Sequence, residues 1–185
     1  MTAPALPFPP LSDAEWPDAI ADLKSGFAGR LNVYRTMAHH PQLLAAWAPL
    51  RDQVVVKHGL GAPFSEVVIL RTGHHMKAPY EWAHHVSRGR ACGMSDARIA
   101  AIAGPLAAME ADDALLSRAV DELVIDKRLS PETITAITAL VGKQGLFDVI
   151  ATVGFYTTLG FIVNSFATPI DDAIAREMVE KPLKT

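Results

Sequence analysis

Three ionisable side chains fall within five residues of the stretch "APYEWAHHVSRGRACG", residues 78–93: Glu81, His84 and His85. In a helix, Glu81, His85 and Arg88 lie on one stripe, with His84 at its edge. Glu81 and His85 are spaced i, i+4, so the carboxylate can reach the imidazole and fix its tautomer, as a general acid or base near neutral pH requires. The same pair on a solvent-exposed helix face contributes only roughly 0.2–0.5 kcal/mol, and the spacing alone leaves both interpretations open.

A further carboxylate, Glu66, lies in the preceding predicted helix, which runs from a capping Ser65 to about Met76. On a helical wheel Glu66 shares a face with Ile69, Leu70 and Gly73, which predicts that it points to the interior. Burial raises the pKa of a carboxyl unless a cation or a donor compensates. The alternative is a first-turn glutamate that favours the helix dipole and faces water.

The sequence predicts no metal site and no cofactor. Glu-x-x-His, the unit that di-iron bundles use twice, occurs once, at residues 81–84, and His-Glu-x-x-His does not occur. The three His-His pairs, at 39/40, 74/75 and 84/85, have side chains that point about 100° apart on a helix and rarely chelate one ion. The single cysteine, Cys92, is more typical of a small core residue than of a nucleophile.

The composition indicates one folded domain in a reducing compartment. The chain has 185 residues, one cysteine and a formal net charge of −3, and nothing in this balance suggests nucleic acid as a partner. The longest apolar stretch, residues 149–163, is shorter than the roughly 20 residues that span a bilayer and predicts a buried core helix. The N-terminus lacks the pattern of a signal peptide. We expect a cytoplasmic protein without a membrane segment.

Caps, glycines and apolar spacing predict helices and no convincing strand. After a proline-rich arm, "PALPFPPLSD", and before a short C-terminal helix, the predicted helices span residues 15–27, 31–37, 42–57, 65–76, 79–92, 96–103, 115–125, 131–141 and 144–165. The fold class is therefore all-α, a single domain of about seven to nine helices. We divide it into an N-terminal arm and helix, residues 1–40, and a main helical region, residues 41–185.

The stretch "FSEVVILRTGHHMKAPYEWAHHVSRGRACGMSDARIAAI" resembles the carboxymuconolactone decarboxylase family, whose superfamily includes the AhpD-type alkylhydroperoxidases. The resemblance covers residues 40–125 well and extends more weakly to "TVGFYTTLGFIVNSFATPID". It implies an AhpD-like helical fold and cofactor-free chemistry on a small substrate, as in the decarboxylation of γ-carboxymuconolactone. It also implies a homo-oligomer, a trimer or hexamer, with a dimer possible.

The peroxidase branch of this superfamily carries Cys-x-x-Cys, a histidine four residues later and a glutamate twelve residues before the first cysteine. In this chain the two cysteine positions are Ala78 and Glu81, whereas the histidine, His85, and the upstream glutamate, Glu66, are retained. Thiol peroxidase chemistry needs a thiolate and a resolving thiol. The resemblance is therefore to the decarboxylase-like branch, in which "YEW" before the histidine is common.

These observations lead to a mechanism in which His85 donates a proton and Glu81 orients it, with Glu66 as a second acid–base group. Two close carboxylates push one pKa upward, so that one of them can stay neutral and donate. The predicted substrate contacts are Arg71, Tyr80, Trp82, His84 and Arg88, of which Arg71 or Arg88 would anchor a carboxylate.

Three alternatives remain open at this stage. The same acid–base groups suit a lactone hydrolase or isomerase. An alkylhydroperoxidase-related protein could use Cys92 with an external thiol. A non-catalytic helical oligomer would bury Glu81 and His85 between subunits, with no adjoining cavity.

Overall fold

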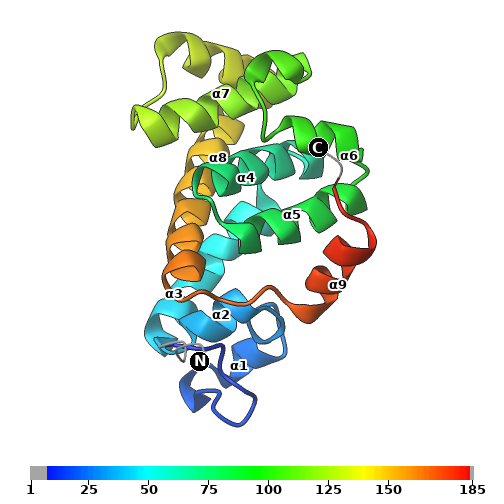
Figure 1. Ribbon diagram of the computed structural model, residues 1–185. Coiled ribbons are helices and arrows are strands. Elements are labelled where there is room, and N and C mark those ends of the chain that lie inside the picture. Colours follow the sequence, from blue (N-terminus) through cyan, green and yellow to red (C-terminus); the bar gives the residue numbers. More distant parts are fainter. Residues whose placement is uncertain (1–7, 184–185) are drawn as a thin grey trace.

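The computed structural model describes residues 8–183, and these residues form helices and no strand (Figure 1). The predicted all-α fold is confirmed. The helices of the described part are η1 (Asp18–Ile20), α1 (Ala21–Lys24), η2 (Ala28–Arg30), α2 (Asn32–Met37), α3 (Pro41–Asp52), the π-helical η3 (Gln53–Lys57), α4 (Ala62–His75), α5 (Pro79–Ala91), α6 (Asp96–Ala101), η4 (Leu106–Ala108), α7 (Ala111–Ile125), α8 (Pro131–Ser165) and α9 (Asp172–Glu180).

The long helix α8 runs along one side of the fold (Figure 1). Its side chains contribute to two hydrophobic clusters. In the first cluster, Phe155 and Leu159 of α8 pack against the N-terminal segments, including Trp16 and Val33. The second cluster lies among α4 to α7, whose buried residues meet Val149 and neighbouring side chains of α8. The N-terminal residues are thus part of the same packed body as the main helical region.

Local sequence signals explain where several helices begin. The side chain of Ser95 accepts a hydrogen bond from the Arg98 amide, and that of Ser130 accepts one from the Thr133 amide, so both predicted caps are confirmed. Within α8 the backbone leaves helical geometry at Gly142, with φ 76° and ψ 171°. Only glycine adopts this conformation readily, and the break separates the two helices that the sequence predicts.

Three predicted helix boundaries are wrong, and one of them is the start of α7, which begins at Ala111 and not at residue 115. Helix α4 begins at Ala62, directly after Gly61 in a left-handed conformation, so Ser65 is a buried residue inside the helix and not its cap. The predicted helix over residues 15–27 is replaced by the short η1 and α1. This segment is held by tertiary contacts such as the Trp16 indole N–H, which donates to the Ile20 carbonyl.

The proline-rich arm falls partly outside the described residues, which begin at Phe8. From there the arm packs on its own chain, where the Phe8 ring meets the rings of His39 and Phe166 edge-to-face at 5.4 and 5.2 Å. Within the described part, α8 is the one helix long and apolar enough to cross a membrane, a property that it shares with the core helices of soluble proteins.

Candidate active site

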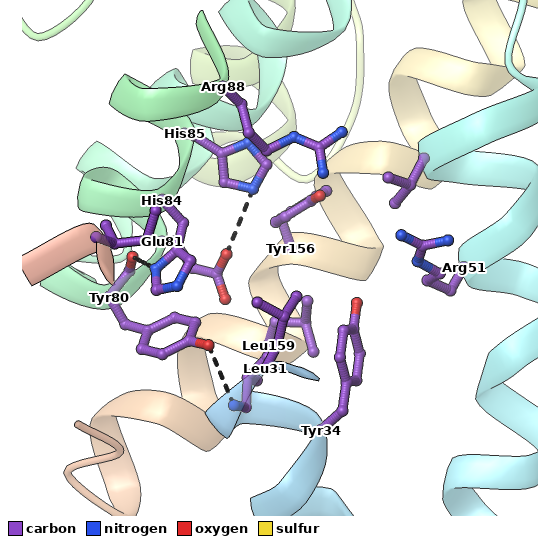
Figure 2. Close-up of a pocket in the computed structure, with 13 residues that line it drawn as sticks. Leu31, Tyr34, Arg51, Tyr80, Glu81, His84, His85, Arg88, Tyr156 and Leu159 are labelled. Carbon is purple, nitrogen blue, oxygen red and sulfur yellow. Dashed lines mark hydrogen bonds and ion pairs between the residues drawn. The ribbon is translucent and has the colours of Figure 1, made fainter. Parts of the chain in front are cut away.

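A cavity of about 220 Å³ lies between the N-terminal helices, α5 and α8 (Figure 2). Its wall is mostly apolar and aromatic, with a few polar groups that converge on the space. The lining residues are Leu31, Val33, Tyr34, Arg51, Val55, Tyr80, Glu81, His84, His85, Arg88, Tyr156, Leu159 and Ile174. A mostly apolar hollow with a few convergent polar groups is the usual form of a small-molecule site.

The predicted convergence of Glu66, Glu81 and His85 depends on the close packing of α4 on α5. A Cβ added at Gly73 of α4 would lie in ordinary van der Waals contact with the Cβ of Glu81, at 3.5 Å, so the two helices pack closely at this point. Glu66, Glu81 and His85 are each at least 95% buried. The structure therefore brings all three side chains into one cluster at the cavity.

Glu66 fixes the ring of His85 from the side away from the cavity. Its Oε2 lies 2.6 Å from His85 Nδ1, and its Oε1 accepts a bond of 3.1 Å from Arg88 Nε. Burial alone raises the pKa of the Glu66 carboxyl, but His85 and Arg88 together hold it below its ordinary value. An ionised Glu66 assigns the ring proton to Nδ1 and leaves Nε2 as the acceptor on the opposite side of the ring.

His85 itself is neutral at neutral pH. Burial lowers the pKa of its imidazole, and the neighbouring charge of Glu66 opposes this shift without reversing it. The ring is also packed at 89° to that of Tyr156, with 4.9 Å between the centroids. The result is an oriented imidazole whose Nε2 is able to accept a proton.

Glu81 lies on the other side of the ring and has a different environment. Its Oε2 is 3.7 Å from His85 Nε2, too long for a hydrogen bond, and its Oε1 has no hydrogen-bond partner among the described residues. Burial raises the pKa of the Glu81 carboxyl to about 8. Glu66, rather than Glu81, therefore orients His85, and Glu81 is a neutral carboxylic acid at the cavity wall.

Tyr80 and His84 form a second polar group at the cavity, joined by Asp171. The Tyr80 hydroxyl donates to Asp171 Oδ2 at 2.6 Å and accepts from the Val33 amide at 3.2 Å. His84 Nε2 lies 2.8 Å from the same carboxylate oxygen, and the His84 ring stacks on that of Tyr80 at 4.1 Å. This network links α5 to α2 and to the segment before α9, and so holds the wall of the cavity together.

Sequence reasoning missed three polar residues of the wall: Tyr34, Arg51 and Tyr156 (Figure 2). The Arg51 side chain is 15% exposed, pairs with Asp52 at 3.4 Å and stacks on the Phe27 ring at 4.4 Å from its centroid, and its Nε has no hydrogen-bond partner among the described residues. Burial raises the pKa of both tyrosine hydroxyls, which therefore remain donors. An incompletely paired guanidinium and two hydroxyls beside Arg88 make this wall suited to an anionic group.

The structure does not bring Arg71 or Trp82 to the cavity. Arg71 makes two hydrogen bonds to Asp121, at 2.7 and 2.8 Å, and donates to the carbonyls of Ile102 and Gly104. Trp82 lies beside His74 in a separate hollow. Of the predicted substrate contacts, Tyr80, His84 and Arg88 line the cavity.

Part of the chain is similar to a known protein family. Residues 41–123 match the model of the carboxymuconolactone decarboxylase family. The matched segment covers 83 of the 185 residues. It contains Glu66, Glu81, His85, Arg88 and also Arg51, whereas Tyr34 and Tyr156 lie outside it.

The fold extends beyond the segment that matches the carboxymuconolactone decarboxylase family. A crystal structure of a variant of the debrominase Bmp8, in complex with 2,3,4-tribromopyrrole, superposes with a TM-score of 0.70 at 12% identity. The match covers 94% of this chain and 96% of that one, so it includes most of the N-terminal helices. No curated protein matches the sequence.

Cys92 is not placed for the thiol chemistry of the AhpD-type relatives. It is not part of the cavity wall, and its thiol donates to the Gly89 carbonyl at 3.2 Å. Burial raises the pKa of the Cys92 thiol, which disfavours the thiolate that would attack a peroxide. Among the described residues no three His, Cys, Asp or Glu side chains are arranged to hold a metal ion.

Proposed function

We propose that the protein is a cofactor-free enzyme that performs acid–base chemistry, decarboxylation or proton transfer, on a small lactone or carboxylic acid. One observation carries the proposal: a carboxylic acid with a pKa of about 8, Glu81, lies beside an oriented neutral imidazole, His85, at the wall of a mostly apolar cavity. Both groups are in the protonation state that proton transfer at neutral pH requires. The similarity of residues 41–123 to the carboxymuconolactone decarboxylase family supports the same reaction class.

In a decarboxylation the bond between the substrate carbon and its carboxylate breaks, and the electron pair enters a conjugated enolate. Glu81 then gives its proton to carbon and becomes a carboxylate. His85 Nε2, 3.7 Å away, takes up a proton from solvent and returns it to Glu81, which restores the resting state. In an isomerisation His85 would remove a proton from carbon and Glu81 would supply one at another position. Relative to the sequence-based mechanism, the donor is therefore Glu81, and His85 acts as the base.

The polar residues of the cavity wall support the proposed class of substrate. Arg51 and Arg88 place positive charge at the cavity, and Tyr34 and Tyr156 add hydroxyl donors, so a carboxylate and its developing enolate would both be stabilised. A cavity of about 220 Å³ lies below the roughly 300–1,000 Å³ of sites for drug-sized ligands. The proposed substrate is therefore a single ring with one or two carboxylates.

The proposal is tested with purified protein and γ-carboxymuconolactone, with product analysis by mass to separate loss of CO₂ from gain of water or from isomerisation. Glu81→Gln and His85→Gln are expected to lower turnover by about 10²–10⁴-fold. His75→Gln is the matched control, because His75 also pairs with a carboxylate, Asp121, but lies outside the cavity wall. The same assay is run on a panel of carboxylated lactones and carboxylic acids. If both cavity variants turn over these compounds as fast as the wild type does, the mechanism is excluded.

A further inference from the structure

The two arginines of the cavity wall differ in how their charges are paired. Arg88 is bonded through Nε to the buried carboxylate of Glu66 at 3.1 Å. Arg51 meets only the carboxylate of its chain neighbour Asp52, at 3.4 Å, and that carboxylate is 48% exposed and also lies 4.0 Å from Lys57. Arg51 Nε is buried without a hydrogen-bond partner in the described part of the chain. The cavity wall therefore carries an excess of positive charge at Arg51.

Two aromatic residues of the N-terminal segment, residues 8–40, surround this cation. The Arg51 guanidinium stacks on the Phe27 ring at 4.4 Å from its centroid. The same ring meets that of Tyr34 edge-to-face, with 4.8 Å between the centroids. Burial raises the pKa of the Tyr34 hydroxyl and the charge of Arg51 partly opposes this rise, as expected of two groups that lie close together. Phe27 thus positions both a cation and a hydroxyl donor.

The chain leaves α-helical geometry directly after Arg51. Helix η3 (Gln53–Lys57) is π-helical, and its residue Val55 lines the cavity. A π turn holds one more residue than an α turn, so it changes which side chains face the cavity, and such turns occur frequently at functional sites. The irregular backbone therefore coincides with the incompletely paired cation of the wall.

Tyr156 of α8 adds a second hydroxyl on this side of the cavity. Tyr34 and Tyr156 are each 4% exposed, and Figure 2 shows their hydroxyls and the Arg51 guanidinium pointing into one space, across the cavity from Glu81. An ionised carboxylate offers about four acceptor sites on two oxygens, so one carboxylate can accept from all three groups. It would also neutralise the charge of Arg51, which a neutral ligand cannot do.

We infer that Arg51, Tyr34 and Tyr156 form a subsite for a carboxylate that the substrate retains through the reaction, and that the N-terminal segment sets this preference. The inference rests on the proposed function, in which Glu81 and His85 are the reacting groups. A carboxylate that departs as CO₂ loses its charge, so a cation bound to it would stabilise the ground state more than the transition state. The cation of the subsite therefore suits the retained carboxylate.

The N-terminal segment gives this preference to the chain. Phe27 and Tyr34 lie outside residues 41–123, which match the carboxymuconolactone decarboxylase family, whereas Glu81 and His85 lie inside them. The reacting pair and the recognition of the carboxylate are thus contributed by different parts of the sequence. Changes in the N-terminal segment should alter which compounds bind without altering the acid–base pair.

The test is calorimetric titration with 2-furoate and 2-furamide, two single rings of similar size of which only the first is charged. At pH 6, below the pKa of Glu81, the wild type is expected to bind 2-furoate about tenfold more tightly than 2-furamide. Arg51→Met should abolish this preference, and Arg51→Lys should keep part of it, because lysine retains the charge but not the planar fork. Arg30→Met is the matched control, since Arg30 is exposed in the same segment and outside the wall.

The role of the N-terminal segment is tested in the same titration. Tyr34→Phe and Phe27→Leu should each weaken binding of 2-furoate by about threefold to tenfold and change binding of 2-furamide less. Equal weakening for both compounds would reduce these residues to a structural role and contradict the inference. Equal affinity of the wild type for the two compounds would overturn it, as would a preference that Arg51→Met and Arg51→Lys both leave intact.

Turnover distinguishes this inference from the proposed reaction. Arg51→Met should raise KM and leave kcat within a few-fold, because contacts to a retained group are equal in the ground state and the transition state. A kcat that rises would place the departing carboxylate at Arg51 and overturn the inference. A wild type that prefers 2-furoate but turns over no carboxylated lactone would contradict the proposed reaction and leave the subsite. Turnover without the preference would contradict the subsite alone.

Discussion

Two clusters of ionisable side chains lie on α4 and its neighbours, and each combines an arginine, a histidine and carboxylates. They differ in how many of their polar atoms have a hydrogen-bond or ion-pair partner. In one, Arg71 and His75 of α4 meet Asp121 of α7 at 2.6–2.8 Å, and Arg71 donates twice more to backbone carbonyls. In the other, at the cavity, Glu81 Oε1 has no partner among the described residues and Glu81 Oε2 stands 3.7 Å from His85. The first cluster is a satisfied ion-pair network.

The difference separates a structural role from a chemical one. A buried polar group that makes all its bonds stabilises one arrangement, and losing its partner is costly. A buried polar group left without a partner destabilises the free protein and is available to a ligand. The exposed fraction alone does not separate the clusters, because Arg71 is 8% exposed and Glu81 is 3% exposed.

A large, pH-dependent effect on stability is expected at the cavity. The pKa of Glu81 rises from 4.5 in an unfolded chain to about 8 in the fold, so the folded state loses stability as pH rises through this range. Glu81→Gln removes this loss. Its free energy of unfolding should exceed that of the wild type, with the gap widening by about 3 kcal/mol from pH 5.5 to pH 8.

Urea denaturation at the two pH values measures this gap, and Glu122→Gln, a replacement of a carboxylate far from the cavity, is the control. If the free energies of unfolding of the wild type and of Glu81→Gln change in parallel with pH, then Glu81 is already ionised in the folded protein.

The opposite sign is expected at the paired cluster. Arg71→Met leaves Asp121 without its principal cation, in a site where the side chains are 10% and 19% exposed. Breaking a buried pair costs about 3–5 kcal/mol, so the variant should unfold at much lower urea concentration. Activity per folded molecule should stay within a few-fold of the wild type, because Arg71 does not line the cavity.

Lys57→Met is the matched control, because Lys57 pairs with Asp52 at 4.0 Å on the surface and such pairs contribute at most about 1 kcal/mol. If the Arg71→Met variant is fully folded but inactive, Arg71 contributes to the substrate site after all.

The pH dependence of turnover is the next effect in size. Activity requires Glu81 protonated and His85 neutral, so kcat/KM should fall about tenfold per pH unit above pH 8. It should also fall on the acid side, below the ordinary pKa of 6.5, because burial lowers the pKa of His85. His75→Gln should give a superimposable profile, and an alkaline limb that begins near pH 5 would assign the proton donor to another group.

Local sequence signals predicted the helices of the site but left the burial of its acids open. The apolar face of α4 pointed Glu66 to the interior with a water-facing first turn as the alternative, and the i, i+4 spacing put Glu81 within reach of His85. The partner of His85 Nδ1 was not predictable from α5 alone. It depends on how α4 packs on α5, and this packing gives the hydrogen bond to Glu66.

The residues of the cavity wall that come from helices other than α5 could not be predicted from local sequence patterns. Tyr34, Arg51 and Tyr156 come from α2, α3 and α8, so only tertiary packing brings them together. Arg51 carried a weak signal, a cation in a largely apolar helix, whereas Tyr34 and Tyr156 looked like ordinary core aromatics. Arg71 was misassigned because its partner, Asp121, lies 50 residues away in the chain.

The smallest expected effect distinguishes positioning from catalysis at Glu66. Glu66→Gln keeps an oxygen that can accept the His85 Nδ1 proton but removes the charge that raises the pKa of the imidazole. The acid limb of the pH–rate profile should therefore move to lower pH by about one unit. The alkaline limb should stay near pH 8, because burial alone raises the pKa of Glu81. An alkaline limb that moves while the acid limb stays would make Glu66, and not Glu81, the proton donor of the site.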